Sequence, residues 1–186
     1  MASSTLIQYL SATGVSGLGV STPFGVAPSD RKQTESFLFT NPNAVGGANI
    51  TLTSGLVMAA DISQMATDSS GGLTALKVVL ADYNSAPVQK VVVGVLEIGS
   101  ATASAGTLVV SPQETVVVTC VVRGPVKNVP VIGATAVGSP LCLDEAGAAG
   151  SAEVYTAAKV GHVVAYALTS TAGAGFVTAY VLGCGI

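Results

Sequence analysis

The sequence predicts an all-β protein, a β-sandwich or barrel with long loops. Its apolar runs are short, rich in Val, and bounded by Gly, Pro, Ser, Asn and Thr, which is the pattern of strands and their turns. Beyond about residue 70 no segment keeps a helical period. The chain also carries 22 Gly and 8 Pro along its length, and both residues disfavour long regular helices.

The expected strands follow one another through the second half of the chain. They are ALKVVLADY at 75–83, QKVVVGVLEI at 89–98, TLVVS at 107–111, ETVVVTCVVRG at 114–124, VGSPLCLD at 137–144, VGHVVAYALT at 160–169 and GFVTAYVLG at 175–183. Helix is expected only in the first ten residues and in DISQMATD at 61–68, which is long enough for two turns at most.

Charge is scarce in this chain. Of 186 residues, 49% are hydrophobic and 9% are charged, against about 25% charged in an average soluble domain. Much of the surface must therefore be Ser, Thr, Gly and Ala, or be covered by partners. The net charge of −3 and the scattered cations, of which only Arg31 and Lys32 are adjacent, exclude a nucleic-acid binder because phosphate affinity needs clustered Lys and Arg.

No targeting segment is expected. The start, MASSTLIQYL, lacks the positive region and the apolar core of a secretory signal. The uncharged tract 160–186 is interrupted by TSTAGAG, so it predicts a hairpin and not a membrane helix. Cys120, Cys142 and Cys184 form no close pair, so they are expected to be small strand or core residues in a reducing compartment, with one bridged pair left open.

Parts of the sequence repeat in the same order. VTCVVRG at 118–124 overlays VTAYVLG at 177–183, and GLVMAAD at 55–61 overlays GSPLCLD at 138–144. Between these anchors, KVVVGVLEI overlays AAKVGHVVA through a shared Val-Gly. This order predicts a tandem duplication, 50–124 and 131–184. The expected organisation is an extended N-terminal arm at 1–28, a first β subdomain at 29–125 and a second at 126–186, with one continuous domain as the alternative.

His162 is the single histidine of the chain, and the overlay places it on Val95. A position that accepts valine is a strand position, so a structural reading is favoured over a catalytic or metal role. Catalysis would need an orienting carboxylate and a nucleophile, and a metal would need further ligands. No spacing in the chain indicates either, so no catalytic residue, metal site or cofactor is expected.

Three further motifs are candidates for chemistry. GVSGLG at 14–19 has no preceding strand and no following Lys-Ser or Lys-Thr, so it predicts a flexible arm and not a phosphate loop. Asp144 and Glu145 could contact calcium, although a solvated turn is the favoured reading. SDRKQTESF at 29–37 is the densest charged patch, either a solvated loop or a polar contact with a partner.

A resemblance to a known family follows from these motifs. The succession RKQTESF, GLVMAAD, the Val-Gly strand, and VPVIGATAVGSPLCLDEAG with KVGHVVAYAL and GFVTAYVLG resembles small β-rich capsid decoration (cement) proteins of tailed bacteriophages. The resemblance covers residues 29–186, most strongly 126–183. It implies a non-enzymatic virion protein on the capsid exterior, made in the host cytoplasm, which often trimerises and locks neighbouring major capsid subunits together.

Two groups of residues are expected to bind partners. The N-terminal arm is expected to reach a neighbouring subunit through an apolar anchor, and the charged patch is expected to make polar contacts. These residues are Leu6, Ile7, Tyr9 and Leu10 in the arm, and Asp30, Arg31, Lys32 and Glu35 in the patch. The expected partners are copies of the chain itself, as a homotrimer, and the major capsid protein, with no nucleic acid and no membrane.

Two other classes stay open. A tail, fibre or other virion-associated or cell-surface adhesion module would share the β content and the oligomeric habit. It would differ in copy number, with tens or fewer per particle instead of hundreds. An enzyme with a dispersed carboxylate site is the third class, with Asp61, Asp82 and Asp144 as its candidate acids.

Overall fold

A computed structural model describes residues 32–61, 66–67, 73–75, 77–82, 91–99, 106–144, 149–157 and 163–182. The chain forms two compact units, Met1–Lys32 and Gln33–Ile186, and the strands among the described residues all belong to the second. The all-β prediction is confirmed, because every regular element among the described residues is a strand. The expected helix at 61–68 is wrong where it is described, since Ala66–Thr67 form strand β4. The expected arm at 1–28 lies outside the described residues.

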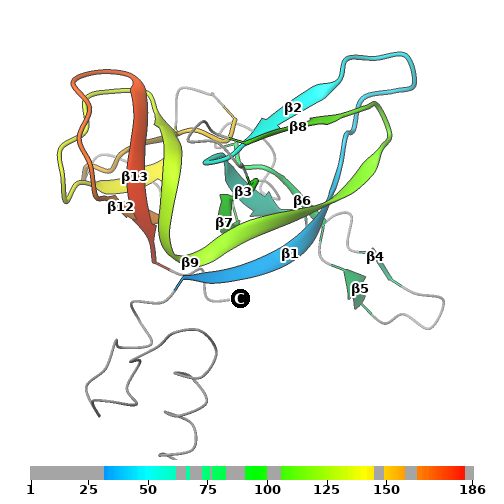
Figure 1. The fold of residues 1–186 in the computed structure, drawn as a ribbon, viewed down its shortest axis with the longest axis horizontal. Coiled ribbons are helices and arrows are strands. Elements are labelled where there is room, and N and C mark those ends of the chain that lie inside the picture. The colour runs from blue at the N-terminus through cyan, green and yellow to red at the C-terminus, as the bar shows by residue number, and fades with distance from the viewer. Residues whose placement is uncertain are drawn as a thin grey trace, which may run out of the picture. The chain divides into compact units, whose positions relative to one another are not determined.

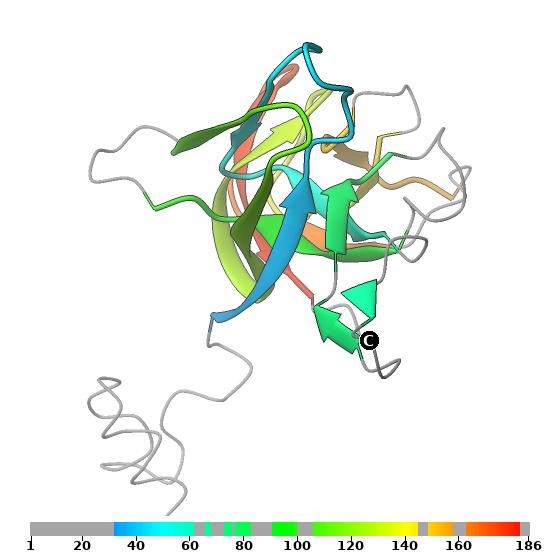
Figure 2. The ribbon, with the colours of Figure 1, turned by 90° about the vertical axis from the view of Figure 1, so that its right-hand side faces the viewer.

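Five strands close into a first ring (Figure 1). In ring order they are β1 (Gln33–Thr40), β6 (Lys77–Leu80), β3 (Val57–Ala60), β7 (Val92–Leu96) and the first part of β9 (Thr115–Val131). The ring closes because β1 pairs with both β6 and β9. Figure 2 shows β1, in blue, beside β6, the one neighbour in this ring to which it runs parallel. Closure gives each of these strands a neighbour on both sides, although β1 meets β6 only at Leu38 and Phe39.

A second ring of five strands follows along the chain. In ring order it comprises the later part of β9, β11 (Ala152–Val154), β10 (Pro140–Leu143), β12 (Ala165–Ala167) and β13 (Gly175–Val181). β13 pairs antiparallel with β9 over most of its length, and β11 joins β9 in parallel at Ala152 and Val131. The two rings therefore share one long strand.

The shared strand β9 changes partners at a glycine. Its pairing with β1 ends at Arg123 opposite Gln33, and its pairing with β13 begins at Gly124 opposite Val181. Gly124 has φ of 112°, a conformation that glycine adopts without steric cost. The strand was predicted to end at 124 because Pro125 and Pro130 are residues that usually interrupt strands. In the structure both prolines lie within β9 and pair with β13, so the strand continues to Val131. The expected subdomain limit at 125/126 falls inside β9, and the limits remain predictions.

Two short pairs of strands accompany the rings. β2 (Ile50–Thr53) pairs with β8 (Thr107–Val110), and β4 pairs with β5 (Leu73–Ala75). Leu52 of β2 and Val110 of β8 are buried in the core of the first ring. Further core residues of that ring are Phe37, Phe39, Met58, Ala60, Val78, Leu96, Val118 and Cys120.

The strands of the two rings are paired in the same order. In chain order, the strands are β1, β3, β6, β7 and β9 in the first ring, and β9, β10, β11, β12 and β13 in the second. In each, the first strand pairs in parallel with the third, and the second pairs antiparallel with the third and the fourth. The fifth strand pairs antiparallel with the fourth and the first. The two rings thus share one order of strand pairing, although their bounds differ from the predicted 50–124 and 131–184 because β1 belongs to the first ring and β9 to both.

The residue register also agrees with two of the three sequence overlays, that of GLVMAAD on GSPLCLD and that of VTCVVRG on VTAYVLG. Met58 pairs with Leu80 in the first ring, and its overlaid residue Leu141 pairs with Val154 in the second. The two aspartates that close these motifs match as well. The Asp61 amide donates to the Lys77 carbonyl, and the Asp144 amide donates to the Ser151 carbonyl.

The third overlay was wrong by four residues. Val95 pairs with Val57 in the first ring, and the residue opposite Pro140, which overlays Val57, is Tyr166. Tyr166 and not His162 therefore corresponds to Val95. A shared Val-Gly was too short to fix the register in a chain rich in both residues. His162 lies outside the described residues, so its structural reading stays a prediction and loses the support of the overlay.

Candidate interaction surface

The predicted partner-binding residues are described only in part. The arm residues Leu6, Ile7, Tyr9 and Leu10 lie outside the described residues, as do Asp30 and Arg31. Lys32 is exposed, and Glu35 is an exposed residue of β1 opposite Cys120. The solvated-loop reading of this patch is therefore wrong from Gln33 onward, where the chain is already strand. The alternation that buries Phe37 and Phe39 was the overlooked signal.

The candidate acids of a dispersed enzyme site lie in different rings. Asp61 follows β3 in the first ring and Asp144 follows β10 in the second, where it is buried. Asp82 lies two residues after β6. Among the described residues, no group of three or more His, Cys, Asp or Glu side chains could hold a metal ion. Cys120 and Cys142 are buried, and Cys184 lies outside the described residues.

The described part of the chain contains no helix that is long and apolar enough to cross a membrane.

Large apolar side chains are exposed on the outer face of the second ring. Tyr166 and Leu168 of the β12 region are 42% and 44% exposed, and Phe176 of β13 is 66% exposed. The term β12–β13 face is used below for these residues and the outward neighbours that flank them in the pairing. The β12–β13 face comprises Pro125, Pro130, Pro140, Tyr166, Leu168, Phe176 and Tyr180.

The alternation of side chains along the strands explains this exposure. On β13, Val177, Ala179 and Val181 point into the second ring and are buried, so the residues between them point outward. Phe176 lies opposite Pro130, and Tyr180 lies opposite both Pro125 and Tyr166. The pairing thus places aromatic and proline rings side by side across three strands.

The β12–β13 face is nearly free of charge. Within β12, β13 and the part of β9 from Gly124 to Val131, Lys127 is the single charged residue. A contiguous apolar surface rimmed by polar residues is typical of an interaction site. Tyrosine suits such a site because its ring is apolar while its hydroxyl can reach water or a polar partner.

A second exposed apolar residue lies on the loop between β1 and β2. Val45 is 88% exposed in the turn closed by a hydrogen bond from the Gly47 amide to the Ala44 carbonyl. The base of this loop is fixed by Asn41, which is fully buried. The Asn41 Nδ2 donates to the carbonyls of Ala48 (3.2 Å) and Val110 (2.9 Å).

Other groups of Asn41 complete the attachment of the loop. Its Oδ1 accepts from the Asn43 amide at 3.0 Å. Its backbone amide donates to the Glu114 carbonyl, and its carbonyl accepts from the Gln113 amide. Gln113 has φ of 64° and donates through Nε2 to the Asn43 carbonyl at 2.7 Å. The turn before β9 and the loop after β1 are therefore one hydrogen-bonded unit.

Comparison with known proteins adds little to this description. No family model matches the sequence, and no curated protein matches it. Among solved structures, the chain is similar to the N base of the head fiber gp8.5 of bacteriophage phi29. The sequence identity is 13% and the TM-score is 0.45, over 80% of this chain and 94% of that one. Values this low assign neither a fold nor a role to the chain.

Proposed function

We propose that this chain is a structural protein of a tailed-bacteriophage virion, which decorates the outer capsid surface and stabilises contacts between major capsid subunits. In this proposal the protein is not an enzyme and uses no cofactor. It associates with itself as a homotrimer and binds the major capsid protein, but neither nucleic acid nor a membrane. It is made in the host cytoplasm and works on the exterior of the capsid.

The observation that carries this proposal is the nearly uncharged β12–β13 face on a unit of closed rings. Exposed apolar area gives favourable energy of about 25 cal/mol per Å² when a partner covers it. The closed rings leave little strand edge for crowded copies to pair with, because each ring strand has a neighbour on both sides. The motif succession that resembles capsid decoration proteins supports the same role.

Two groups of residues are proposed to supplement this face. Residues 1–28 reach onto a neighbouring subunit through an apolar anchor, and the charged patch that follows contacts the capsid. The anchor is Leu6, Ile7, Tyr9 and Leu10, and the patch is Asp30, Arg31, Lys32 and Glu35.

A binding experiment tests the decoration role. Shells of the phage that encodes this chain are purified from a deletion strain, mixed with the purified full-length protein, and sedimented. We expect saturable co-sedimentation and a shell that withstands heating better when occupied. Protein that stays in the supernatant at every ratio, with shells of unchanged thermal stability, would contradict the proposal.

A tail, fibre or adhesion component is the alternative function. The observation that favours it is the hydrogen-bonded loop that presents Val45, since binding residues are often carried on loops positioned by a scaffold. Immunogold labelling of intact particles separates the two functions. Decoration predicts gold over the whole head, and the alternative predicts gold at the tail or at isolated points.

A further inference from the structure

We infer that two matching turns of this chain, one in each ring, are contact points that fit equivalent apolar pockets on two neighbouring copies of one partner protein. These paired turns are residues 44–47 and 136–139, and their tips are Val45 and Val137. The inference rests on the proposed function where it names the partner, because the neighbouring copies are then subunits of the major capsid protein.

The paired turns occupy the same place in the internal repeat. The first lies in the loop 41–49, which follows β1, the first strand of the first ring. The second lies in the loop 132–139, which follows β9, the first strand of the second ring. Figure 1 shows the two loops at the upper right and the upper left of the unit, so one pocket cannot receive both tips. The two loops are therefore equivalent elements at separate points of the surface.

The geometry of the paired turns is also the same. Both begin with the sequence Ala-Val-Gly. In both, the amide of the fourth residue donates to the carbonyl of the first, at 2.8 Å in the first ring and 3.2 Å in the second. Gly46 and Gly138 have φ of 84° and 83°, whereas neither valine has a positive φ. This combination makes each of them a type II turn.

The turn type explains the glycine of this motif but not the valine. A type II turn needs a positive φ at its third residue and makes no such demand on its second. Val45 is 88% exposed and Val137 is 65% exposed, and neither belongs to a core cluster. Neither loop contains a charged residue. The same apolar side chain is thus presented to solvent twice, in the same conformation, without serving the packing of either ring.

The bases of the two loops are fastened by different means. The first loop is held by the buried Asn41, which donates to the Val110 carbonyl. The second is held by the buried Thr135, whose amide and carbonyl pair with those of Thr171 at 2.9 Å. The two copies therefore differ in how the loop is attached and agree in the tip. This contrast indicates that the tip is the shared requirement.

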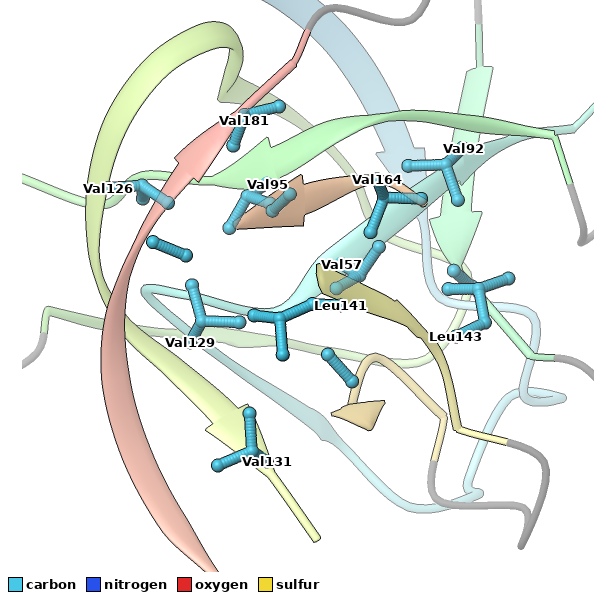
Figure 3. Packing of buried hydrophobic residues seen from close by; sticks show 14 of the residues in the cluster. Val57, Val92, Val95, Val126, Val129, Val131, Leu141, Leu143, Val164 and Val181 are labelled. Atoms are coloured by element: carbon cyan, nitrogen blue, oxygen red, sulfur yellow. The ribbon is translucent and has the colours of Figure 1, made fainter. Parts of the chain in front are cut away.

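The spacing between the paired turns is set by the fold, because the two rings share a core. Figure 3 shows Val57 and Val95 of the first ring lying among Val129 and Leu141 of the second, in one buried cluster. Val57 and Val95 point out of the first ring, since their neighbours in the chain belong to its own core. Two contact points that are held in place before binding lose less conformational freedom when a partner is bound.

The duplication of the contact point indicates the kind of partner. Two equivalent tips are matched by two equivalent pockets, which a partner provides when two copies of it stand side by side. Each pocket is apolar and small, because each tip brings one valine and no charge. Joining two contacts in one unit raises the apparent affinity about 10²–10⁴-fold over one contact. An array of identical subunits supplies this arrangement, and a partner present in one copy does not.

Aspartate substitutions at the two tips test the inference on shells. Val45→Asp, Val137→Asp and the double variant each charge a tip that belongs to no core. Val117→Asp is the matched control, because Val117 is an exposed valine of β9, 67% exposed against 65% for Val137. The full-length proteins are titrated onto shells from the deletion strain, and circular dichroism checks the fold.

We expect each single tip variant to raise the apparent dissociation constant at least about tenfold, and the double variant to raise it further. Val117→Asp should bind as the unaltered chain does. An unchanged dissociation constant for either Val45→Asp or Val137→Asp would overturn the inference. An equal loss of binding by Val117→Asp would overturn it as well.

Photo-crosslinking in assembled particles identifies the partner directly. A benzophenone-bearing amino acid replaces Val45, Val137 or Val117 in the full chain, the particles are irradiated, and the adducts are mapped by mass spectrometry. We expect the two tips to be joined to the same region of the same polypeptide, and position 117 to form no such adduct. Adducts of the two tips with different proteins, or no adduct at either tip, would show that the paired turns are not equivalent contacts.

The identity of the cross-linked polypeptide separates the inference from the proposed function. If both tips are joined to one region of the major capsid protein, both stand. If both are joined to one region of a repeated tail or fibre protein, the paired turns stand and decoration is wrong. If the unaltered chain saturates shells and both tip variants bind equally well, decoration stands and the paired turns are wrong.

Discussion

Cys120 lies on β9 with its side chain inside the first ring. Burial raises the pKa of its thiol from 9.0 to about 12, because the low-dielectric interior disfavours the thiolate. The folded protein therefore keeps this proton at pH values where the unfolded chain has lost it. Below pH 9 both states are protonated and Cys120 adds no pH dependence.

Stability should fall as the pH rises from 9 toward 12. The unfolded thiol ionises in that window and the folded one does not, so the free energy of unfolding should drop by up to about 1.4 kcal/mol per pH unit. Cys120→Ala removes this contribution, and alanine is the residue at the corresponding position of the second ring, Ala179. Urea unfolding of both proteins between pH 8 and 11 checks this. Identical pH slopes for the two proteins would contradict it.

Asn41 is the buried polar residue on which the loop at 41–49 depends. Asn41→Ala leaves the Val110 carbonyl and the Asn43 amide without this partner, so we expect it to lower the free energy of unfolding by about 2–4 kcal/mol. Asn43 supplies the control, since it also donates to the Ala48 carbonyl but from a more exposed position. Asn43→Ala should lower the free energy of unfolding by less than about 1 kcal/mol. Equal losses by chemical denaturation would show that the loop does not depend on Asn41.

At the scale of elements, two glycines precede equivalent strands and differ in their surroundings. Gly55 precedes β3 with φ of 102°, and Gly138 precedes β10 with φ of 83°. A Cβ at Gly55 would lie 1.8 Å from the backbone oxygen of Asn128, whereas a Cβ at Gly138 meets nothing within 4 Å. Both substitutions strain the backbone, but the first also forces β9 away from β3.

The pair Gly55→Ala and Gly138→Ala isolates that difference. We expect Gly138→Ala to lower the free energy of unfolding by about 1–2 kcal/mol, the cost of a positive φ in a residue with a Cβ. Gly55→Ala should lower it by several kcal/mol more or prevent folding, because backbone atoms must separate. Thermal unfolding of both variants measures this, and equal midpoints would refute the close packing of β3 against β9.

The sequence predicted the strands that alternate clearly and failed where local chemistry competed with tertiary structure. β1 was missed because charged residues at its start masked the buried Phe37 and Phe39. β11 was missed because it is three residues long and carries Glu153, which is buried in the structure. Proline residues ended the prediction of β9 early, although pairing with β13 accommodates them. Ring closure depends on pairs such as Phe37 with Val118, which no local pattern contains.

The candidate surface was within reach of the sequence only in part. The run GFVTAYVLG alternates, so it predicts one buried and one outward row, but not which row a neighbouring ring would cover. That answer needed the residue register of both rings, and the sequence overlay of KVVVGVLEI on AAKVGHVVA had the wrong register. Once Tyr166 replaces His162 as the residue that corresponds to Val95, the contrast between a buried and an exposed row becomes visible.

At the scale of the whole molecule, the proposed arm makes a prediction of its own. Deleting residues 1–28, which contain no charged residue, should weaken shell attachment while Gln33–Ile186 keeps its fold. Co-sedimentation with shells and circular dichroism measure the two properties separately. Full occupancy by the truncated protein would show that the arm is not an anchor.

The central claim, that the chain decorates a capsid, is tested most directly by counting its copies in the particle. Quantitative mass spectrometry of purified virions, with the major capsid protein as internal standard, gives that number. The account predicts hundreds of copies per particle, in a fixed ratio to the major capsid protein. A count of tens or fewer, or absence of the chain from the particle, would contradict it.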